Sequence, residues 1–252
     1  MSDLFWLSEE QLAIIKPCFP LAHGVPRVDD RRVVSGIIFV IRNGLRWRDA
    51  PREYGPHKTL YNRFIRWSRL GVFDKIFSRL TAEAGAPELL MIDATHLKAH
   101  RTAASLLKKG MFPRRIGRTK GGLNSKLHAV VDELGRPVIL CLTEGQMSDH
   151  IGAKLIYPAL PQGPAHLLGD KGYDSDEFRQ ALLAKGITPC IPPRKGRNFP
   201  ASFNKTLYKQ RHKVENMFGR LKDWRRVATR YDRCAHTFFS AICLAAIVIW
   251  WI

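Results

Sequence analysis

The stretch ELLMID, residues 88–93, places a carboxylate at the end of a short apolar run. A run of this length and composition is typical of a buried β-strand, and Asp93 is its last residue. The stretch HLLGD, residues 166–170, repeats the pattern and ends on Asp170. We therefore expect two buried strands that each carry an aspartate at one end.

The surrounding sequence predicts an α/β fold. The turn 133–136 lies between two strand-like runs, LHAVVD and PVILCLTE, and this arrangement predicts a β-hairpin. Early strands followed by alternating helices and strands predict a mixed sheet flanked by helices. The remaining expected elements are helices at about 175–184 and 208–224, the strand 187–191, and an apolar C-terminal helix.

That C-terminal stretch, FFSAICLAAIVIWWI at residues 238–252, contains no charged residue. A membrane-spanning helix needs about 20 apolar residues, and this stretch is shorter. We interpret it as a buried core helix, with a membrane anchor as the alternative.

Residues 1–84 are expected to be helical and to form a DNA-binding domain, with residues 85–252 forming a second domain. Ser8 and Gln11 have the spacing of a capping box, and a helix at 29–43 stops at Gly44. A basic helix at 57–70 follows, and together these features favour a helix-turn-helix-like unit. A helical bundle whose outer face is simply basic is the alternative.

The net charge indicates a polyanionic partner. Lys and Arg number 41 against 22 Asp and Glu, a formal charge of +19. Such self-repulsion favours nucleic acid as the partner over a merely basic protein. Five scattered cysteines fit a reducing cytosol, and the acidic N-terminus is no signal peptide. We expect a cytoplasmic protein that does not bind membranes.

Two basic stretches that contain Gly and Pro, residues 106–122 and 192–200, interrupt the second region. Each has the composition of a solvated loop, and each also suits a segment that lies along DNA phosphates.

The two strand-end aspartates suggest metal chemistry. A buried carboxylate costs free energy unless its charge is offset, and Mg²⁺ readily binds carboxylate oxygens together with waters and phosphate. Aspartates on neighbouring strand ends could hold two ions about 4 Å apart for an in-line phosphoryl displacement. Aspartates that only form turns or helix caps are the alternative.

The stretch YKQRHKVENMFGRLKDW, residues 208–224, predicts a helix with one ionic edge. Within about 60° of one another on this edge lie four side chains, Tyr208, Arg211, Glu215 and Lys222. A separate apolar stripe suits packing on the sheet and consists of Val214, Met217, Phe218 and Leu221. Glu215 could complete a metal site between two phosphate-binding cations. A simple ion pair with Arg211 on a solvated face is the alternative.

Over nearly its whole length the chain resembles the DDE transposases of bacterial insertion sequences, in particular the insertion-sequence-five family. The motifs that carry this resemblance are MIDATHLKAHR (91–101), GRTKGGLNSKLHAVVDELGRP (117–137), LLGDKGYDS (167–175) and YKQRHKVENMFGRLKDWRRVATRYD (208–232). The last is the most specific, because its Y-x2-R-x3-E-x6-K spacing matches the family without a gap.

The resemblance implies a ribonuclease-H-like catalytic domain in which Asp93, Asp170 and Glu215 form the catalytic, metal-binding triad. Two Mg²⁺ (or Mn²⁺) ions are the implied cofactors. The implied partners are double-stranded DNA, both terminal inverted repeats and target, and a second copy of the chain in a homodimer or larger assembly. Candidate DNA contacts are Lys58, Arg63, Arg66, Arg114, Arg115, Lys120, Arg194, Lys195, Tyr208, Arg211 and Lys222.

The expected reaction is metal-dependent cleavage at the ends of the element, followed by joining of the 3′-hydroxyl groups to target DNA. A DNA-binding regulator or a nuclease that only hydrolyses DNA is the alternative.

Overall fold

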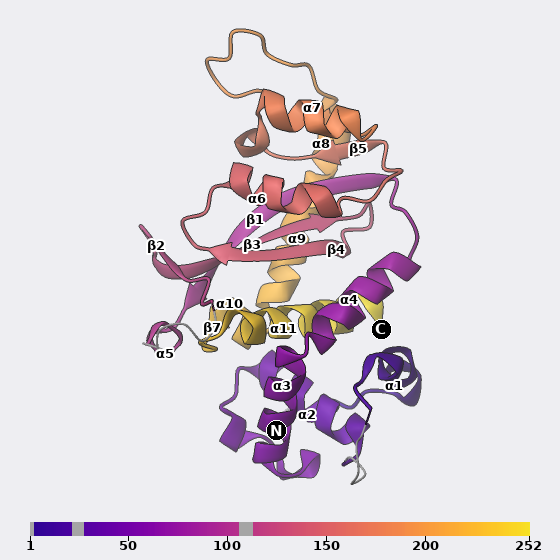
Figure 1. The fold of residues 1–252 in the computed structure, drawn as a ribbon, viewed down its shortest axis with the longest axis vertical. Helices are drawn as coiled ribbons and strands as arrows, with labels where there is room; N and C mark the ends of the chain where they lie inside the picture. Colours follow the sequence, from indigo (N-terminus) through magenta and orange to yellow (C-terminus); the bar gives the residue numbers. More distant parts are fainter. Residues whose placement is uncertain (1–2, 22–27, 106–112) are drawn as a thin grey trace. The chain divides into compact units, whose positions relative to one another are not determined.

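The computed structural model describes residues 3–21, 28–105 and 113–252 (Figure 1). Residues 106–112, the first part of the predicted basic stretch 106–122, lie outside the described residues. Contacts divide the chain into two compact units. We call the first the helical unit; it comprises Met1–Leu80, Ala99–Arg114 and Leu221–Ile252. We call the second the sheet unit; it comprises Thr81–Lys98 and Arg115–Arg220.

The sheet unit is built on a mixed sheet with the strand order β2-β3-β1-β5-β6, in which β4 also pairs with β3. The strands β1, β3 and β4 are antiparallel to their neighbours in this group, whereas β1, β5 and β6 run parallel. The strands are β1 (Leu89–Ala99), β2 (Gly117–Thr119), β3 (Gly122–Val131), β4 (Pro137–Glu144), β5 (His166–Leu168) and β6 (Thr188–Cys190). The predicted mixed sheet is therefore confirmed.

A hydrogen-bonded turn closes the predicted hairpin between β3 and β4. The buried carboxylate of Asp132 accepts the N–H groups of Leu134 and Arg136, and its Oδ2 also lies 2.7 Å from Arg136 Nε. Gly135 adopts a φ of 78°, which L-residues with a side chain rarely adopt. The hydrogen bonds of the turn and the two strand-like runs on either side of it thus both support the predicted hairpin.

One face of the sheet is covered by α6 (Asp149–Ile156) and α7 (Asp176–Ala184). Leu90 and Ile92 of β1 pack there with Ile156 of α6 and Leu182 of α7 in one buried cluster. Ser148 and Ser175 cap the two helices through their side chains. The sequence reasoning predicted α7 but missed α6.

The opposite face carries Met91 and Asp93, because successive residues of a strand point to opposite sides. Asp93 pairs with Arg211, which lies immediately before α9 (His212–Lys222), so α9 approaches this face. The predicted apolar stripe of α9 is buried, with Val214, Met217, Phe218 and Leu221 each at most 5% exposed.

The expected single helix over residues 208–224 is interrupted. It begins as α8 (Lys205–Tyr208), passes through a 3-10 turn at Lys209–Arg211, and continues as α9. Tyr208 and Glu215 therefore do not share one regular α-helix. The angles predicted between side chains around a regular α-helix therefore hold only from His212 onward.

The helical unit contains the N-terminal helices and the C-terminal segment. The capping box at Ser8 and Gln11 and the left-handed Gly44 after the second helix are both present, as predicted. The helices are α1 (Glu9–Ile15), α2 (Asp30–Asn43), α3 (His57–Arg69), most of α4 (Val72–Glu83), α5 (Arg101–Ala104), α10 (Arg225–Ala228) and α11 (Ala235–Ala246), with a π-helical end at Ile247–Trp251. The short strand β7 (Thr229–Arg230) also lies here, and its Arg230 carbonyl accepts the N–H of His100.

The connection between α2 and α3 differs from the short turn of a helix-turn-helix. Residues 44–56 contain two 3-10 turns, Trp47–Asp49 and Arg52–Tyr54. A typical helix-turn-helix joins its helices through about three or four residues. DNA binding by α3 therefore stays a prediction, and the form of the α2–α3 connection adds no support to it.

The apolar C-terminal stretch forms a core helix, as predicted. Nearly all of α11 is buried, and it contacts α2, α3 and α10. Among the residues that the structure describes, no helix is long and apolar enough to cross a membrane.

The packing groups the chain differently from the predicted boundary at residue 84. Residues 221–252 pack with the N-terminal helices because α11 supplies apolar surface to α2 and α3. The functional assignment of residues 1–84 to DNA binding and 85–252 to catalysis stays a prediction.

Two helical glycines provide a matched test of the packing of α2 against Tyr54. A Cβ on Gly36 of α2 would lie 2.7 Å from Tyr54 Cβ, whereas a Cβ on Gly219 of α9 would meet no atom within 4 Å. We expect Gly36→Ala to destabilise the protein by about 1–3 kcal/mol through overpacking. We expect Gly219→Ala to stabilise it by about 0.5–1 kcal/mol through helix propensity. Urea unfolding measures both, and equal effects would contradict the packing of α2 against Tyr54.

Candidate active site

The strand register brings Asp93 and Asp170 together. Met91 of β1 pairs with Leu168 of β5 in parallel register, and each aspartate lies two residues beyond its member of this pair. Neighbouring strands are about 4.8 Å apart, so the two carboxylates arrive at one edge of the sheet. The prediction that Asp170 follows the end of its strand is confirmed, whereas Asp93 does not end its strand, because β1 continues from Asp93 to Ala99 through its pairing with β3.

The pKa of Asp93 reflects this position. Its side chain is 21% exposed, and burial raises its pKa above the ordinary value of 3.8. The N–H of Ala94 and the charge of Arg211 oppose that rise, and the charge of Asp170 adds to it. Asp93 thus carries a negative charge that needs a cation beside it.

Arg211 supplies this cation and links Asp93 to the third acid. Its Nη1 donates to Asp93 Oδ2 at 2.9 Å, and its Nη2 donates to Glu215 Oε1. The alternative considered from sequence, an ion pair of Arg211 with Glu215, is therefore present. The same guanidinium also brings Glu215, whose side chain is 55% exposed, to the edge that carries Asp93.

Tyr208 lies at the same edge. Burial raises the pKa of the Tyr208 hydroxyl group. Arg211 forms a hydrogen bond with the Tyr208 side chain and lowers this pKa, whereas the charges of Asp170 and Asp93 raise it. Lys222 is the last residue of α9 and belongs to the helical unit, and its contact with DNA stays a prediction.

Three residues that the sequence reasoning missed surround Asp170. Asp149 begins α6, and its Oδ1 lies 2.8 Å from the ammonium group of Lys126 on β3. The hydroxyl group of Tyr173 is buried without a hydrogen-bond partner in the described part of the chain, and the charges of Asp149, Asp93 and Asp170 add to the rise that burial causes in its pKa. No local pattern indicated Asp149, because only the packing of α6 brings it to β5.

The donor set fits a divalent metal ion in its chemistry. Carboxylate oxygens are the ligands that Mg²⁺ and Mn²⁺ prefer, and the buried Tyr173 hydroxyl is the polar atom here that finds no partner among the described residues. Within residues 3–21, 28–105 and 113–252, no three His, Cys, Asp or Glu side chains are close enough to enclose an ion. Arg211 instead neutralises Asp93 and Glu215.

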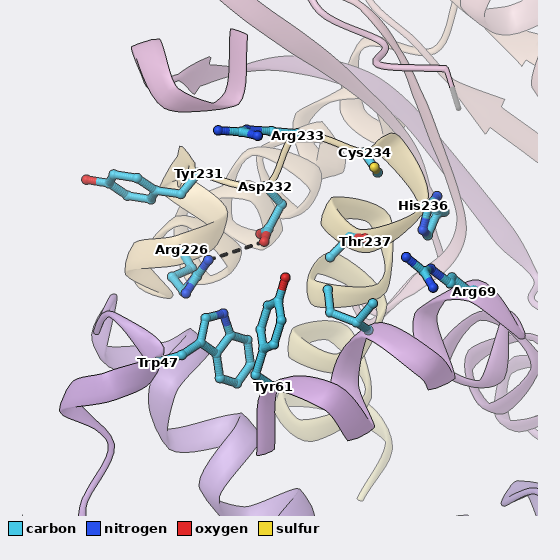
Figure 2. Close-up of a pocket in the computed structure, with 11 residues that line it drawn as sticks. Trp47, Tyr61, Arg69, Arg226, Tyr231, Asp232, Arg233, Cys234, His236 and Thr237 are labelled. Carbon is cyan, nitrogen blue, oxygen red and sulfur yellow. Dashed lines mark hydrogen bonds and ion pairs between the residues drawn. The ribbon is translucent and has the colours of Figure 1, made fainter. Parts of the chain in front are cut away.

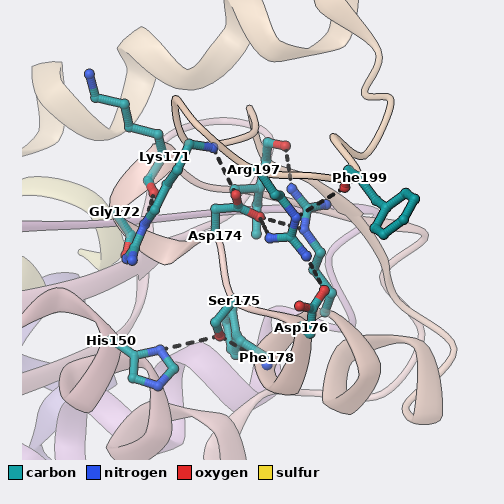
Figure 3. Close-up of polar contacts among 12 residues, drawn as sticks. His150, Lys171, Gly172, Asp174, Ser175, Asp176, Phe178, Arg197 and Phe199 are labelled. Carbon is teal, nitrogen blue, oxygen red and sulfur yellow. Dashed lines mark hydrogen bonds and ion pairs between the residues drawn. The ribbon is translucent and has the colours of Figure 1, made fainter.

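A buried ion-pair network supports the turn that follows Asp170 (Figure 3). Asp174 is fully buried and lies 2.8 Å from Arg179 Nε and 2.7 Å from Arg197 Nη1. It also accepts the backbone N–H of Arg194, whose guanidinium donates to the carbonyl groups of Lys171 and Gly172. The network therefore ties the loop 192–200 to the residues directly after Asp170.

The predicted DNA contacts in the basic loops have different surroundings. Arg194 holds the Asp170 turn, Arg114 donates to the carbonyl groups of Ala104 and Ser105, and Arg115 pairs with Glu144 at 3.4 Å. Lys120 and Lys195 are exposed. DNA contact by all five stays a prediction.

The three cations predicted on α3 also differ. Lys58 and Arg66 are exposed, whereas Arg63 forms a largely buried ion pair with Asp30 of α2 at 2.5 Å and lies over the Trp67 ring. Arg63 therefore holds α3 against α2. Tyr61, which the helical pattern placed inside, is 43% exposed.

A hollow of about 390 Å³ lies within the helical unit (Figure 2). Trp47 and Tyr61 give it aromatic walls, and Arg226 lies with its guanidinium 5.3 Å from the Trp47 ring centre while pairing with Asp232 at 3.2 Å. Arg69 and Arg233 also line it. Aromatic and cationic side chains together are typical of surfaces that bind bases and phosphates.

Three family models match this sequence. One, described as "Putative transposase of IS4/5 family", covers residues 7–77. Two, each described as "Transposase DDE domain", cover residues 84–201 and 167–251.

Known proteins show the same likeness. The "Putative transposase for insertion sequence element IS6501" of Brucella ovis is 34% identical over 130 residues, which are 51% of this chain and 98% of the relative. A protein of the same description for insertion sequence element IS402 of Burkholderia cepacia is 31% identical over 156 residues, 55% of this chain and 72% of the relative.

Among solved structures, piggyBac transposase in a synaptic complex with hairpin DNA matches with a TM-score of 0.51 and 10% identity. The match covers 94% of this chain and 69% of that chain. At this identity the likeness concerns the fold alone, and it confirms the expected ribonuclease-H-like architecture.

Removal of the Arg211 cation should raise the pKa of Asp93 further. Arg211 acts on Asp93 through its charge and a hydrogen bond, both of which favour the ionised carboxylate. We expect Arg211→Gln to shift the Asp93 titration to higher pH in carboxyl-carbon NMR. Arg220→Gln, an exposed change on the same helix, is the control and should leave it in place. An unchanged Asp93 titration in Arg211→Gln would contradict the ion pair.

Loss of Asp174 should destabilise the sheet unit. Asp174→Ala leaves Arg179 buried without its counter-charge, at a cost of roughly 3–5 kcal/mol in the free energy of unfolding. Burial opposes ionisation of Asp174, but donors from Arg194, Arg179 and Arg197 hold its pKa below 3.8. The contribution of Asp174 is therefore complete above pH 3.8 and lost as pH falls through the lowered pKa.

Urea unfolding at several pH values measures this effect. Glu177→Gln, an exposed change in the first turn of α7 and outside this network, is the matched control and should change stability little. Equal stability of the two variants at pH 7 would show that the network contributes nothing.

Proposed function

The chain belongs to the DDE transposases of bacterial insertion sequences, and on that premise we propose that it cuts DNA at the ends of such an element and joins the freed 3′-hydroxyl groups to target DNA. The observation that supports this most directly is that Arg211 joins Asp93 to Glu215, while the register of β5 against β1 brings Asp170 beside Asp93.

Asp93, Asp170 and Glu215 would hold two Mg²⁺ or Mn²⁺ ions. Bound ions would lower the pKa of a water molecule and stabilise the charge that develops on the attacking and leaving oxygens. Asp93 favours such a cation because burial disfavours its charge in the absence of one. Asp170 is oriented by the Gly172 N–H, which donates to its Oδ1 at 2.8 Å.

Arg211 and Tyr208 would bind the DNA backbone beside these acids. A guanidinium can donate two parallel hydrogen bonds to a phosphate, and Arg211 presents both of its Nη groups at the sheet edge. When the acids are neutralised by cations, Arg211 can exchange its carboxylate partners for a phosphate. Lys222 would grip a phosphate further along the DNA.

The helical unit would recognise the terminal inverted repeats. Lys58 and Arg66 on α3 and the aromatic, cationic hollow between Trp47 and Arg226 are the surfaces that suit this contact. Double-stranded DNA is the proposed partner of both units. Because two ends must be joined, we propose that the protein acts as a homodimer or larger assembly on DNA.

Alanine substitution of the triad tests the assignment. We expect Asp93→Ala, Asp170→Ala and Glu215→Ala each to abolish Mg²⁺-dependent nicking of labelled DNA that carries the ends of the element, while DNA binding persists. Glu177→Gln, an exposed carboxylate change on α7, should leave cleavage intact. EDTA should abolish cleavage by the unchanged protein.

Cleavage that survives in all three alanine variants would refute the triad. Tight DNA binding without cleavage in any divalent metal would instead indicate a DNA-binding regulator. Nicking without joined products would indicate a nuclease that only hydrolyses DNA.

A further inference from the structure

We propose that Asp149 is a fourth carboxylate of the active site, which pairs with Asp170 across Gly172 to bind one divalent cation. The proposal rests on the proposed function in one respect, because it places this cation at the metal site of the transposase. It goes beyond the triad by assigning a metal ligand to the beginning of α6.

The geometry around Gly172 carries the proposal. A Cβ placed on Gly172 would lie 2.8 Å from Asp170 Oδ1 and 3.5 Å from Asp149 Oδ2. Both carboxylates therefore face the position that any other residue would fill with a side chain. The absence of a side chain leaves room between two oxygens of the kind that Mg²⁺ binds.

Lys126 orients Asp149 toward this space. Its ammonium group lies 2.8 Å from Asp149 Oδ1 and also donates to the Met147 carbonyl at 2.9 Å. The Lys126 side chain is only 9% exposed, so its position on β3 is fixed by packing. With Oδ1 held by Lys126, Oδ2 of Asp149 is the oxygen directed toward Gly172.

The Tyr173 hydroxyl group independently indicates a missing ligand. It is fully buried and has no hydrogen-bond partner among the residues that the structure describes, which costs free energy in a folded protein. Of the three aspartates whose charges act on it, Asp149 has the largest effect. A water molecule bound to a cation between these acids would provide the partner that this hydroxyl lacks.

The charges around the site leave an excess that one divalent cation would balance. Asp93, Asp149, Asp170 and Glu215 carry four negative charges when ionised. Arg211 and Lys126 are the cations paired with them, so two negative charges remain. In the part of the chain that the structure describes, no cation pairs with Asp170.

A site of two carboxylates suits Mg²⁺ and Mn²⁺. Mg²⁺ usually retains several waters and binds through one or two carboxylates together with substrate phosphates. Asp149 and Asp170 can therefore bind a cation without a third protein ligand in contact. DNA would supply the remaining oxygens.

Titration with Mn²⁺ by isothermal calorimetry tests the proposal on the full chain, alone and bound to DNA that carries the ends of the element. We expect Asp149→Asn, which keeps the shape of the side chain, to weaken Mn²⁺ binding about tenfold or more. Gly172→Ala should weaken it as well, because the added methyl group fills the space between the oxygens. Glu177→Gln is the matched control and should bind Mn²⁺ like the unchanged protein.

Asp149→Cys provides a readout that does not depend on loss of binding. A thiolate favours softer ions, so this variant should bind Cd²⁺ more tightly than the unchanged protein does, while its Mn²⁺ binding weakens. Circular dichroism confirms that each variant is folded.

Equal Mn²⁺ affinity in Asp149→Asn and the unchanged protein would overturn the proposal, as would a lack of Mn²⁺ binding by the unchanged protein. If Asp149→Asn binds Mn²⁺ normally while the unchanged protein cleaves DNA, the proposed function stands without this ligand. If Asp149→Asn loses Mn²⁺ binding but the unchanged protein cleaves nothing, the cation site stands and the proposed cleavage activity fails.

Discussion

The parallel pairing of β1 with β5 is the constraint on which the rest of the site depends. Leu90 and Met91 pair with Leu167 and Leu168, and this register sets where Asp93 and Asp170 leave the core. A slip by one residue would turn the buried residues of β1 to the other face and separate the two acids. The same apolar side chains thus stabilise the sheet and position the carboxylates.

Concentrating carboxylates at one edge creates a repulsion that the fold offsets with buried or half-buried cations. Arg211 lies between Asp93 and Glu215, and Lys126 pairs with Asp149. These cations belong to β3 and to the residues before α9, so both faces of the sheet contribute. In such an arrangement, metal ions could replace the protein cations beside the carboxylates. A displaced cation could then bind a phosphate.

Local sequence patterns predicted much of the architecture because they report local physics. The β3–β4 hairpin follows from two strand-like runs around a turn, and the helix ending at Gly44 follows from its apolar period and its C-terminal glycine. The break at Lys209–Arg211 was missed, since the residues on either side have ordinary helical character. Arg63 was expected to be exposed, but its pairing partner Asp30 lies on another helix.

The sequence by itself determined the apolar strands, the aspartates that follow their apolar runs, the helix that carries Glu215, and the family motifs. Each of these features depends on residues that are close together in the sequence, so secondary-structure propensity and hydrophobic periodicity predict it. Only the tertiary structure decided that Lys126 pairs with Asp149 close to the turn after Asp170, and that the C-terminal helix packs with the N-terminal helices. Those contacts join segments far apart along the chain, and their position depends on packing of the whole core, which no local pattern records.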